Sequence, residues 1–130
     1  MRNVTLCLLV RNDQISLGQK KRGFGQGNYN GYGGKPKEGE SLEDATIREL
    51  YEETGVVARA EDLKKRAILS FTFQYKPEWN QVVHVYHLQR YEREPTESTE
   101  MKPEWFSFEA VPYDIVNQLN NSVSNWLVYY

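Results

Sequence analysis

Cysteine is almost absent from this sequence of 130 residues, in which Cys7 is the only one. A lone cysteine cannot form a disulfide within the chain, which is typical of proteins in a reducing compartment. Because Cys7 lies in the apolar run Val4–Val10, we interpret it as a small core residue rather than as a nucleophile. The cysteine content therefore predicts a cytoplasmic protein.

Long hydrophobic runs are also missing. No segment of the sequence reaches the roughly 18 apolar residues that a membrane-spanning helix needs. The apolar run near the N-terminus is short, and no small-residue cleavage site of a signal peptide follows it. We therefore expect neither a membrane span nor a signal peptide.

The sequence also has no excess of basic residues. It contains 16 Lys and Arg residues and 18 Asp and Glu residues, which gives a net charge of −2. Proteins with long nucleic-acid grooves usually carry a strong positive excess, so we expect no binding of duplexes or long strands. A nucleotide-sized ligand needs only a few local cations. The aromatic content is 13%. Aromatic rings fill cores and also stack on bases, and composition alone does not choose between these roles.

Repeats, low-complexity tracts and linkers are absent too, which predicts a single domain over residues 1–130. Residue patterns predict strands at Val4–Val10, Gln14–Lys20, Ala67–Tyr75, Gln81–Tyr91 and Trp105–Phe108. One helix is expected at Ser41–Thr54 and a second from Pro112 to about Asn120, with polar loops at 22–34 and 92–103. Strands interleaved with two helices indicate an α/β layered fold.

One motif stands out around the first predicted helix. It reads G-x5-E-x7-R-E-U-x-E-E-x-G-U, where U is aliphatic, and its fixed positions are Gly34, Glu40, Arg48, Glu49, Leu50, Glu52, Glu53, Gly55 and Val56. Because helix side chains three and four residues apart share a face, Glu49, Glu52 and Glu53 project together. These carboxylates repel one another, and the helix dipole disfavours anions near the C-terminal end. The cluster therefore needs a cation.

Carboxylate oxygens are hard ligands that select Mg²⁺ or Mn²⁺. Such ions bind phosphate oxygens and activate water, so the motif predicts a metal-dependent enzyme acting on phosphate groups. Glu53 is the preferred general base and Glu52 the alternative, while Arg48, four residues before Glu52, is expected to orient it. Gly33 precedes the motif and allows close backbone approach, with a carbonyl available to the metal.

Other polar residues have less specific patterns. Lys20, Lys21 and Arg22 form a basic cluster that is either a solvated turn or a phosphate contact. His84 and His87 have an odd spacing on a predicted strand, so they point to opposite faces and cannot form a two-histidine metal site there. We expect structural roles for both histidines.

The motif is the Nudix box, and the chain from about Thr5 to Pro112 resembles MutT-type Nudix hydrolases, especially the oxidised-purine nucleoside triphosphatases (8-oxo-dGTPases) of animals. The resemblance extends beyond the box to Lys20–Gly25, Asn30-Gly31, Glu97–Met101 and Trp105-Phe106. It implies the Nudix α/β/α sandwich, with a mixed β-sheet between helices. It also implies water attack on a phosphorus of a nucleoside triphosphate, giving the monophosphate and pyrophosphate.

The resemblance implies site residues as well. Glu49, Glu52 and Glu53 would hold the metals with a backbone oxygen of Gly33, and Glu100 matches a further carboxylate near them. Asn30 matches an asparagine that hydrogen-bonds the base, and Lys20 is expected to contact the substrate. The matching positions that line the base pocket are Thr5, Phe24 and Phe71.

The C-terminal region departs from that group. The animal enzymes read the purine there with a Trp and two adjacent Asp residues, whereas this chain has Asn117-Gln118-Leu119-Asn120-Asn121. Two alternatives therefore stay open: a Nudix hydrolase for another nucleoside diphosphate derivative, such as an RNA 5′ end or a nucleotide sugar, and a non-catalytic nucleotide-binding domain. We expect a monomer whose partner is a small nucleotide.

Overall fold

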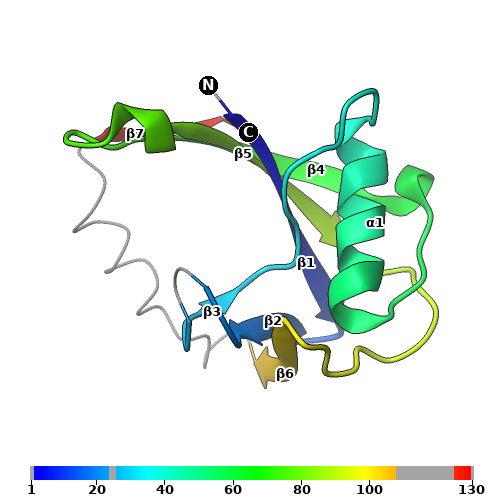
Figure 1. Cartoon of the computed structure of the whole chain (residues 1–130). Coiled ribbons are helices and arrows are strands. Elements are labelled where there is room, and N and C mark those ends of the chain that lie inside the picture. The colour runs from blue at the N-terminus through cyan, green and yellow to red at the C-terminus, as the bar shows by residue number, and fades with distance from the viewer. Residues whose placement is uncertain (1, 24–25, 108–124, 130) are drawn as a thin grey trace.

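The computed structural model describes residues 2–23, 26–107 and 125–129, which form a curved sheet with a helix against one face (Figure 1). The strands are β1 (Arg2–Arg11), β2 (Gln14–Lys20), β3 (Tyr29–Asn30), β4 (Lys64–Thr72), β5 (Gln81–Leu88), β6 (Met101–Ser107) and β7 (Asn125–Tyr129). The helix is α1 (Leu42–Thr54), and two short 3-10 turns are η1 (Ala60–Asp62) and η2 (Pro77–Trp79).

The sheet is mixed, as expected. Its strand order is β3-β2-β1-β5-β4-β7, and β6 pairs with β2 outside this path. Strands β1 and β5 run parallel, with Thr5 opposite His84, whereas the other strand pairs are antiparallel. The expected α/β class and mixed sheet are confirmed. The second helix, expected at 112–120, lies outside the described residues.

Side chains of β1 alternate between the two faces of the sheet, as a strand requires. Cys7 and Leu9 point to the α1 face, where they pack with Leu50 and Leu88 in a buried cluster. Burial raises the pKa of the Cys7 thiol to about 12, which supports its role as a core residue. The opposite face carries a second apolar cluster, made of Phe71, Val83, Val85, Val4, Leu6, Leu8, Ala67, Leu69 and Phe73.

Local signals define α1 at both ends. Ser41 is the N-cap, and its side chain accepts a hydrogen bond from the Asp44 backbone N–H at 3.0 Å, which satisfies one of the unpaired N–H groups of the first turn. Gly55 ends the helix in the left-handed conformation, with φ of 77°. In the described ranges, no helix combines the length and apolar content needed to cross a membrane.

Strand boundaries differ from expectation in four strands. β1 spans Arg2–Arg11 instead of Val4–Val10. β4 spans Lys64–Thr72 instead of 67–75, and β5 ends at Leu88 instead of residue 91. β6 begins at Met101, inside the expected loop 92–103, because it pairs with the whole length of β2 from Lys20 opposite Met101 onward. β3 and β7 were not anticipated. β3 has only two residues and carries little local signal, whereas the composition of Asn125–Tyr129 favours a strand.

Candidate active site

The three carboxylates of the motif occupy different depths at the end of α1. Glu53 is buried, and its Oε1 accepts a hydrogen bond from the Gly33 backbone N–H at 2.8 Å. Glu49 is half-buried beside Gly34, whereas Glu52 is exposed. Packing against the Gly33-Gly34 segment therefore distinguishes Glu53 from Glu52, which the sequence alone left open.

These carboxylates share an electrostatic environment. Burial raises the pKa of Glu53 to about 8, and the charges of Glu49, Glu100 and Glu52 add to this effect. Burial also raises the pKa of Glu49, with Glu52 and Glu100 again contributing. Glu100, distant in sequence, is thus close enough for its charge to act on half-buried Glu49 and on buried Glu53. The donor set is oxygen only and rich in negative charge, which fits a Mg²⁺ or Mn²⁺ ion.

Arg48 neutralises part of this cluster. Its Nη1 lies 3.0 Å from Glu49 Oε1 and 3.2 Å from Glu52 Oε2. Within the described part of the chain, three or more His, Cys, Asp or Glu side chains do not converge as a ready-made metal site. The carboxylates that we expect to hold a metal are instead partly engaged by a guanidinium and by the Gly33 N–H.

The strongest contact of Arg48 is with Glu40, to which we had assigned no role. Arg48 Nε donates to Glu40 Oε2 at 2.8 Å and Nη2 donates to Oε1 at 3.0 Å, a two-pronged pair. This pair holds the pKa of Glu40 down at about 2. Arg48 therefore ties the loop before α1 to the carboxylate face, and the spacing of eight residues hides this contact from helical patterns.

The Arg48–Glu40 pair is expected to make the thermal stability of the protein depend on pH in the acidic range. The folded-state pKa of Glu40 is about 2, below the unfolded value of about 4.3. The ionised Glu40 carboxylate therefore stabilises the folded protein fully above about pH 4.3, and this stabilisation is lost as pH falls toward 2. We expect Glu40→Gln to lower Tm at pH 7, with the difference from wild type narrowing below about pH 5. Thermal unfolding across pH measures this, with exposed Glu38→Gln as the control. A Tm difference between Glu40→Gln and wild type that does not change with pH would contradict this expectation.

Thr5 holds the segment that faces Glu53. Its backbone N–H donates to the Gly34 carbonyl at 2.9 Å, and its buried side-chain Oγ1 lies 3.2 Å from that oxygen and 3.3 Å from the Gly34 N–H. Thr5 belongs to the α1 face, whereas Phe71 packs in the cluster on the opposite face. The structure therefore does not bring these two expected base-pocket residues together.

The other expected substrate residues are spread over the β2–β3 region. Asn30 is exposed on β3, and its Oδ1 accepts from the Gly31 N–H at 3.0 Å. Lys20 is half-buried at the end of β2. Its neighbours Lys21 and Arg22 turn instead to an acidic loop that contains Glu100. Phe24 lies outside the described residues.

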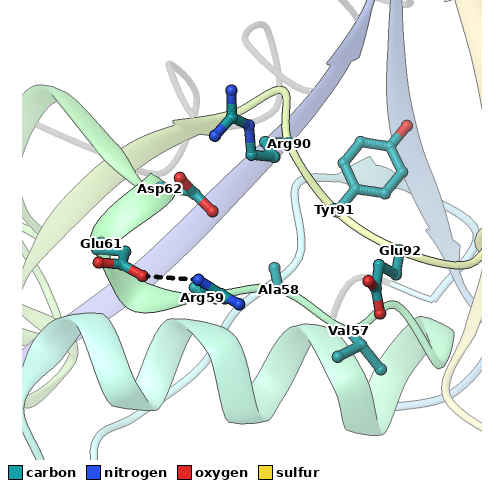
Figure 2. A pocket seen from close by; sticks show the side chains of 8 residues that line it. All are labelled: Val57, Ala58, Arg59, Glu61, Asp62, Arg90, Tyr91 and Glu92. Carbon is teal, nitrogen blue, oxygen red and sulfur yellow. Dashed lines mark hydrogen bonds and ion pairs between the residues drawn. The ribbon is translucent and has the colours of Figure 1, made fainter.

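A hollow of about 670 Å³ lies beside η1 (Figure 2). It mixes cationic and acidic side chains, including an exposed Arg59–Glu61 pair at 3.3 Å. The residues that line it are Val57, Ala58, Arg59, Glu61, Asp62, Arg90, Tyr91 and Glu92. None of them is among the expected site residues.

Comparison with known proteins identifies the family. A model of the NUDIX domain matches residues 1–127. The chain belongs to the Nudix family. The chain is similar to the oxidized purine nucleoside triphosphate hydrolase of Mus musculus, with 43% identical residues over 84% of this chain and 68% of that protein. The protein of the same name from Danio rerio is 43% identical over 85% of this chain and 69% of its own length.

Solved structures show the same Nudix fold. The MutT NUDIX hydrolase from Burkholderia pseudomallei superposes with a TM-score of 0.76 at 23% identity, covering 92% of this chain and 95% of the other. The Nudix box, the MutT resemblance and the assignment as a Nudix hydrolase are thereby confirmed. Nudix hydrolases typically use divalent metal ions.

Proposed function

We propose that this Nudix hydrolase converts oxidised purine nucleoside triphosphates, such as 8-oxo-dGTP, to the monophosphate and pyrophosphate. The observation that carries the proposal is the 43% identity to the mouse oxidized purine nucleoside triphosphate hydrolase over 84% of the chain. The intact carboxylate cluster around buried Glu53 supports catalysis rather than binding alone. We further propose that the protein acts as a monomer in the cytoplasm, which size-exclusion chromatography and cell fractionation would test.

A divalent ion, Mg²⁺ or Mn²⁺, would be held by the Gly33 carbonyl together with Glu49, Glu52, Glu53 and Glu100. Such an ion supplies positive charge to phosphate oxygens and lowers the pKa of water. Burial, together with the charges of the neighbouring carboxylates, raises the pKa of Glu49 and of Glu53, and a nearby cation would favour the ionised form of both.

Glu53 is the proposed general base. The attacking water would form a bond to phosphorus, its proton would pass to Glu53, and the bond from that phosphorus to the bridging oxygen would break. The Gly33 N–H fixes Glu53 Oε1 at 2.8 Å, which leaves Oε2 to accept the proton. Arg48 orients Glu52 and Glu49 through Nη1.

Base and phosphate recognition are proposed for the β2–β3 region and the sheet face opposite α1. Lys20 would contact the phosphates, Asn30 would hydrogen-bond the base, and Phe24 and Phe71 would line the base pocket. The Cβ of a residue at 31 would lie 2.5 Å from Leu6 Cδ2, so the Asn30-Gly31 corner abuts the opposite-face cluster that includes Phe71. Thr5 would contribute to the pocket through the Gly34 segment that it holds.

Metal-dependent product release tests the function. We expect pyrophosphate release from 8-oxo-dGTP in Mg²⁺ or Mn²⁺, none in EDTA, and a higher kcat/KM for 8-oxo-dGTP than for dGTP. A higher kcat/KM for a capped RNA end or a nucleotide sugar would favour the alternative substrates. Nucleotide binding without any hydrolysis would favour a non-catalytic domain.

Glu100→Ala should raise the metal concentration needed for half-maximal activity. The reason is that its charge acts on both Glu49 and Glu53, and removal of one oxygen donor weakens a site that binds hard cations. Titration of Mg²⁺ at saturating nucleotide measures the effect, and Glu61→Ala, at an exposed position within η1, is the control. An unchanged titration would assign Glu100 to the surface.

Asn30→Ala should change base preference without preventing phosphate cleavage. A lost hydrogen bond to the preferred base costs roughly 1–3 kcal/mol, or about one to two orders of magnitude in kcat/KM. The competing role is a turn contact, since Asn30 Oδ1 accepts from the Gly31 N–H. Measuring 8-oxo-dGTP and dGTP in both proteins separates the roles, because a parallel fall with a lower Tm would indicate the turn.

A further inference from the structure

Lys21 binds the loop that carries Glu100 through both its side chain and its backbone. The ammonium Nζ donates to Glu97 Oε2 at 2.5 Å and to the Ser98 carbonyl at 2.9 Å. The backbone N–H of Lys21 donates to the Glu100 carbonyl at 2.9 Å. One lysine at the end of β2 thus contacts residues along the middle of this loop.

The same loop is anchored at both of its ends. At the first end, Thr96 donates from its backbone N–H and its Oγ1 to the Thr54 carbonyl, at 2.8 and 3.0 Å. Thr54 directly follows Glu53 in α1. At the second end, Met101 is buried in the core cluster on the α1 face. Residues 96–101 therefore bridge the end of α1 and the start of β6.

The turn between these anchors depends on Ser98. Its Oγ accepts from the backbone N–H groups of Glu100 and Met101 at 3.2 and 3.1 Å. Its own N–H donates to the Met101 carbonyl at 2.9 Å. These contacts close the turn on itself. Beside the Lys20–Met101 pair, where β6 begins, the Lys21 contacts hold residues 97, 98 and 100 close to the end of β2.

The side chain of Glu100 is not held in place by its own ion pair. Its partner Arg22 lies 3.6 Å away, and both side chains are more than half exposed, so the pair contributes little. The Glu100 carboxylate nevertheless acts electrostatically on Glu49 and Glu53. Its position beside the motif is therefore set by the backbone of the loop.

We propose that Lys21 is a positioning residue of the metal site, which fixes residues 97–100 so that the Glu100 carboxylate stays beside Glu49 and Glu53. This inference rests on the metal role of Glu100 in the proposed function. It also gives two neighbouring lysines of the basic cluster different roles. Lys20 would contact the substrate, whereas Lys21 holds the loop that carries Glu100. Loss of an outer partner of a metal ligand typically weakens metal affinity 10–100-fold.

Direct Mn²⁺ binding to the whole protein tests this, with free Mn²⁺ measured by electron paramagnetic resonance. We expect Lys21→Met to raise the Mn²⁺ Kd about tenfold, Lys21→Arg to restore most of the affinity, and exposed Lys64→Met to leave it unchanged. In a Glu100→Ala background, the effect of Lys21→Met should disappear, because both changes act on one ligand. Tm of each variant reports any general loss of structure.

An unchanged Kd in Lys21→Met overturns the inference, and so does a full Lys21→Met effect that persists without Glu100. If Glu100→Ala alone leaves the Kd unchanged, the metal role of Glu100 fails together with the inference. If the Kd shifts are found but no nucleoside triphosphate is hydrolysed, the proposed function fails and the role of Lys21 stands. Should Lys21→Met not fold, Ser98→Ala is expected to give the same Glu100-dependent shift.

Discussion

Glu53→Gln is expected to lower kcat by about 10²–10⁴-fold, the usual loss when a general base is removed. Glutamine preserves the shape of the side chain, and its Oε1 can still accept the Gly33 N–H hydrogen bond seen for Glu53 at 2.8 Å. What it removes is the negative charge and the basic oxygen. Single-turnover and steady-state rates at saturating metal measure the change, and near-normal kcat would remove Glu53 from this role.

The same substitution should make the metal-free protein more stable at pH 8. The folded-state pKa of Glu53 is about 8, above the unfolded value of about 4.3. The free energy of unfolding therefore falls as pH rises from about 4.3 to about 8. A neutral Gln avoids the cost of a buried charge, roughly 5 kcal/mol from the difference between these two pKa values, which is expected to raise Tm by roughly 10 °C or more.

Thermal unfolding in EDTA at pH 8 and at pH 4 checks the stability effect. Near pH 4 the carboxyl of Glu53 is neutral in the folded protein, and the advantage of Gln should shrink. Glu52→Gln is the matched control, because Glu52 is exposed and carries no comparable burial cost. A Glu53→Gln protein that is less stable than wild type at pH 8 would contradict the burial argument.

Gly33→Ala is expected to reduce both stability and activity severely. A Cβ at this position would lie 1.9 Å from the Thr5 carbonyl oxygen and 2.9 Å from Leu6 Cα. These atoms belong to the backbone of β1, which is paired with β5 along most of its length, so the Gly33 segment must move instead. Overpacking typically costs about 1–3 kcal/mol, and loss of the Glu53 hydrogen bond leaves a buried acceptor unpaired.

Displacement of Gly33 by about 1 Å should also lower kcat about 100-fold, because catalytic groups tolerate little misplacement. Gly34→Ala is the matched control. Its Cβ would meet the carboxyl end of Glu49 at 2.7 Å, a flexible side chain that can shift. We expect a smaller loss of Tm in Gly34→Ala, and equal Tm values for Gly33→Ala and wild type would refute the clash.

The catalytic helix and its motif could be predicted from the sequence because their signals are local. The Ser41 cap, the Gly55 end and the three- and four-residue spacing of Glu49, Glu52 and Glu53 all lie within one helix. Helix geometry fixes these relations whatever the helix packs against. The central strands were predicted for a similar reason, since their composition favours strands.

Contacts between distant segments could not be predicted in this way. The bounds of β6 depend on its pairing with β2, and the partners of Lys21 lie 76 and 77 residues away in sequence. Thr5 was expected in a base pocket, but its hydrogen bonds to Gly34 follow from the path of a loop across β1. No local pattern encodes that path.

The sequence by itself determined that this protein has a carboxylate face on a capped helix, the Nudix box, and a mixed α/β fold to hold it. Only the tertiary structure decided which carboxylate is buried, because helix periodicity places Glu52 and Glu53 on either side of Glu49 and does not say which side other segments cover. Packing of the Gly33-Gly34 segment against Thr5 leaves room for the Glu53 side chain beneath it and leaves Glu52 in solvent. The difference in their chemistry is a matter of desolvation, which depends on every segment that surrounds the side chain.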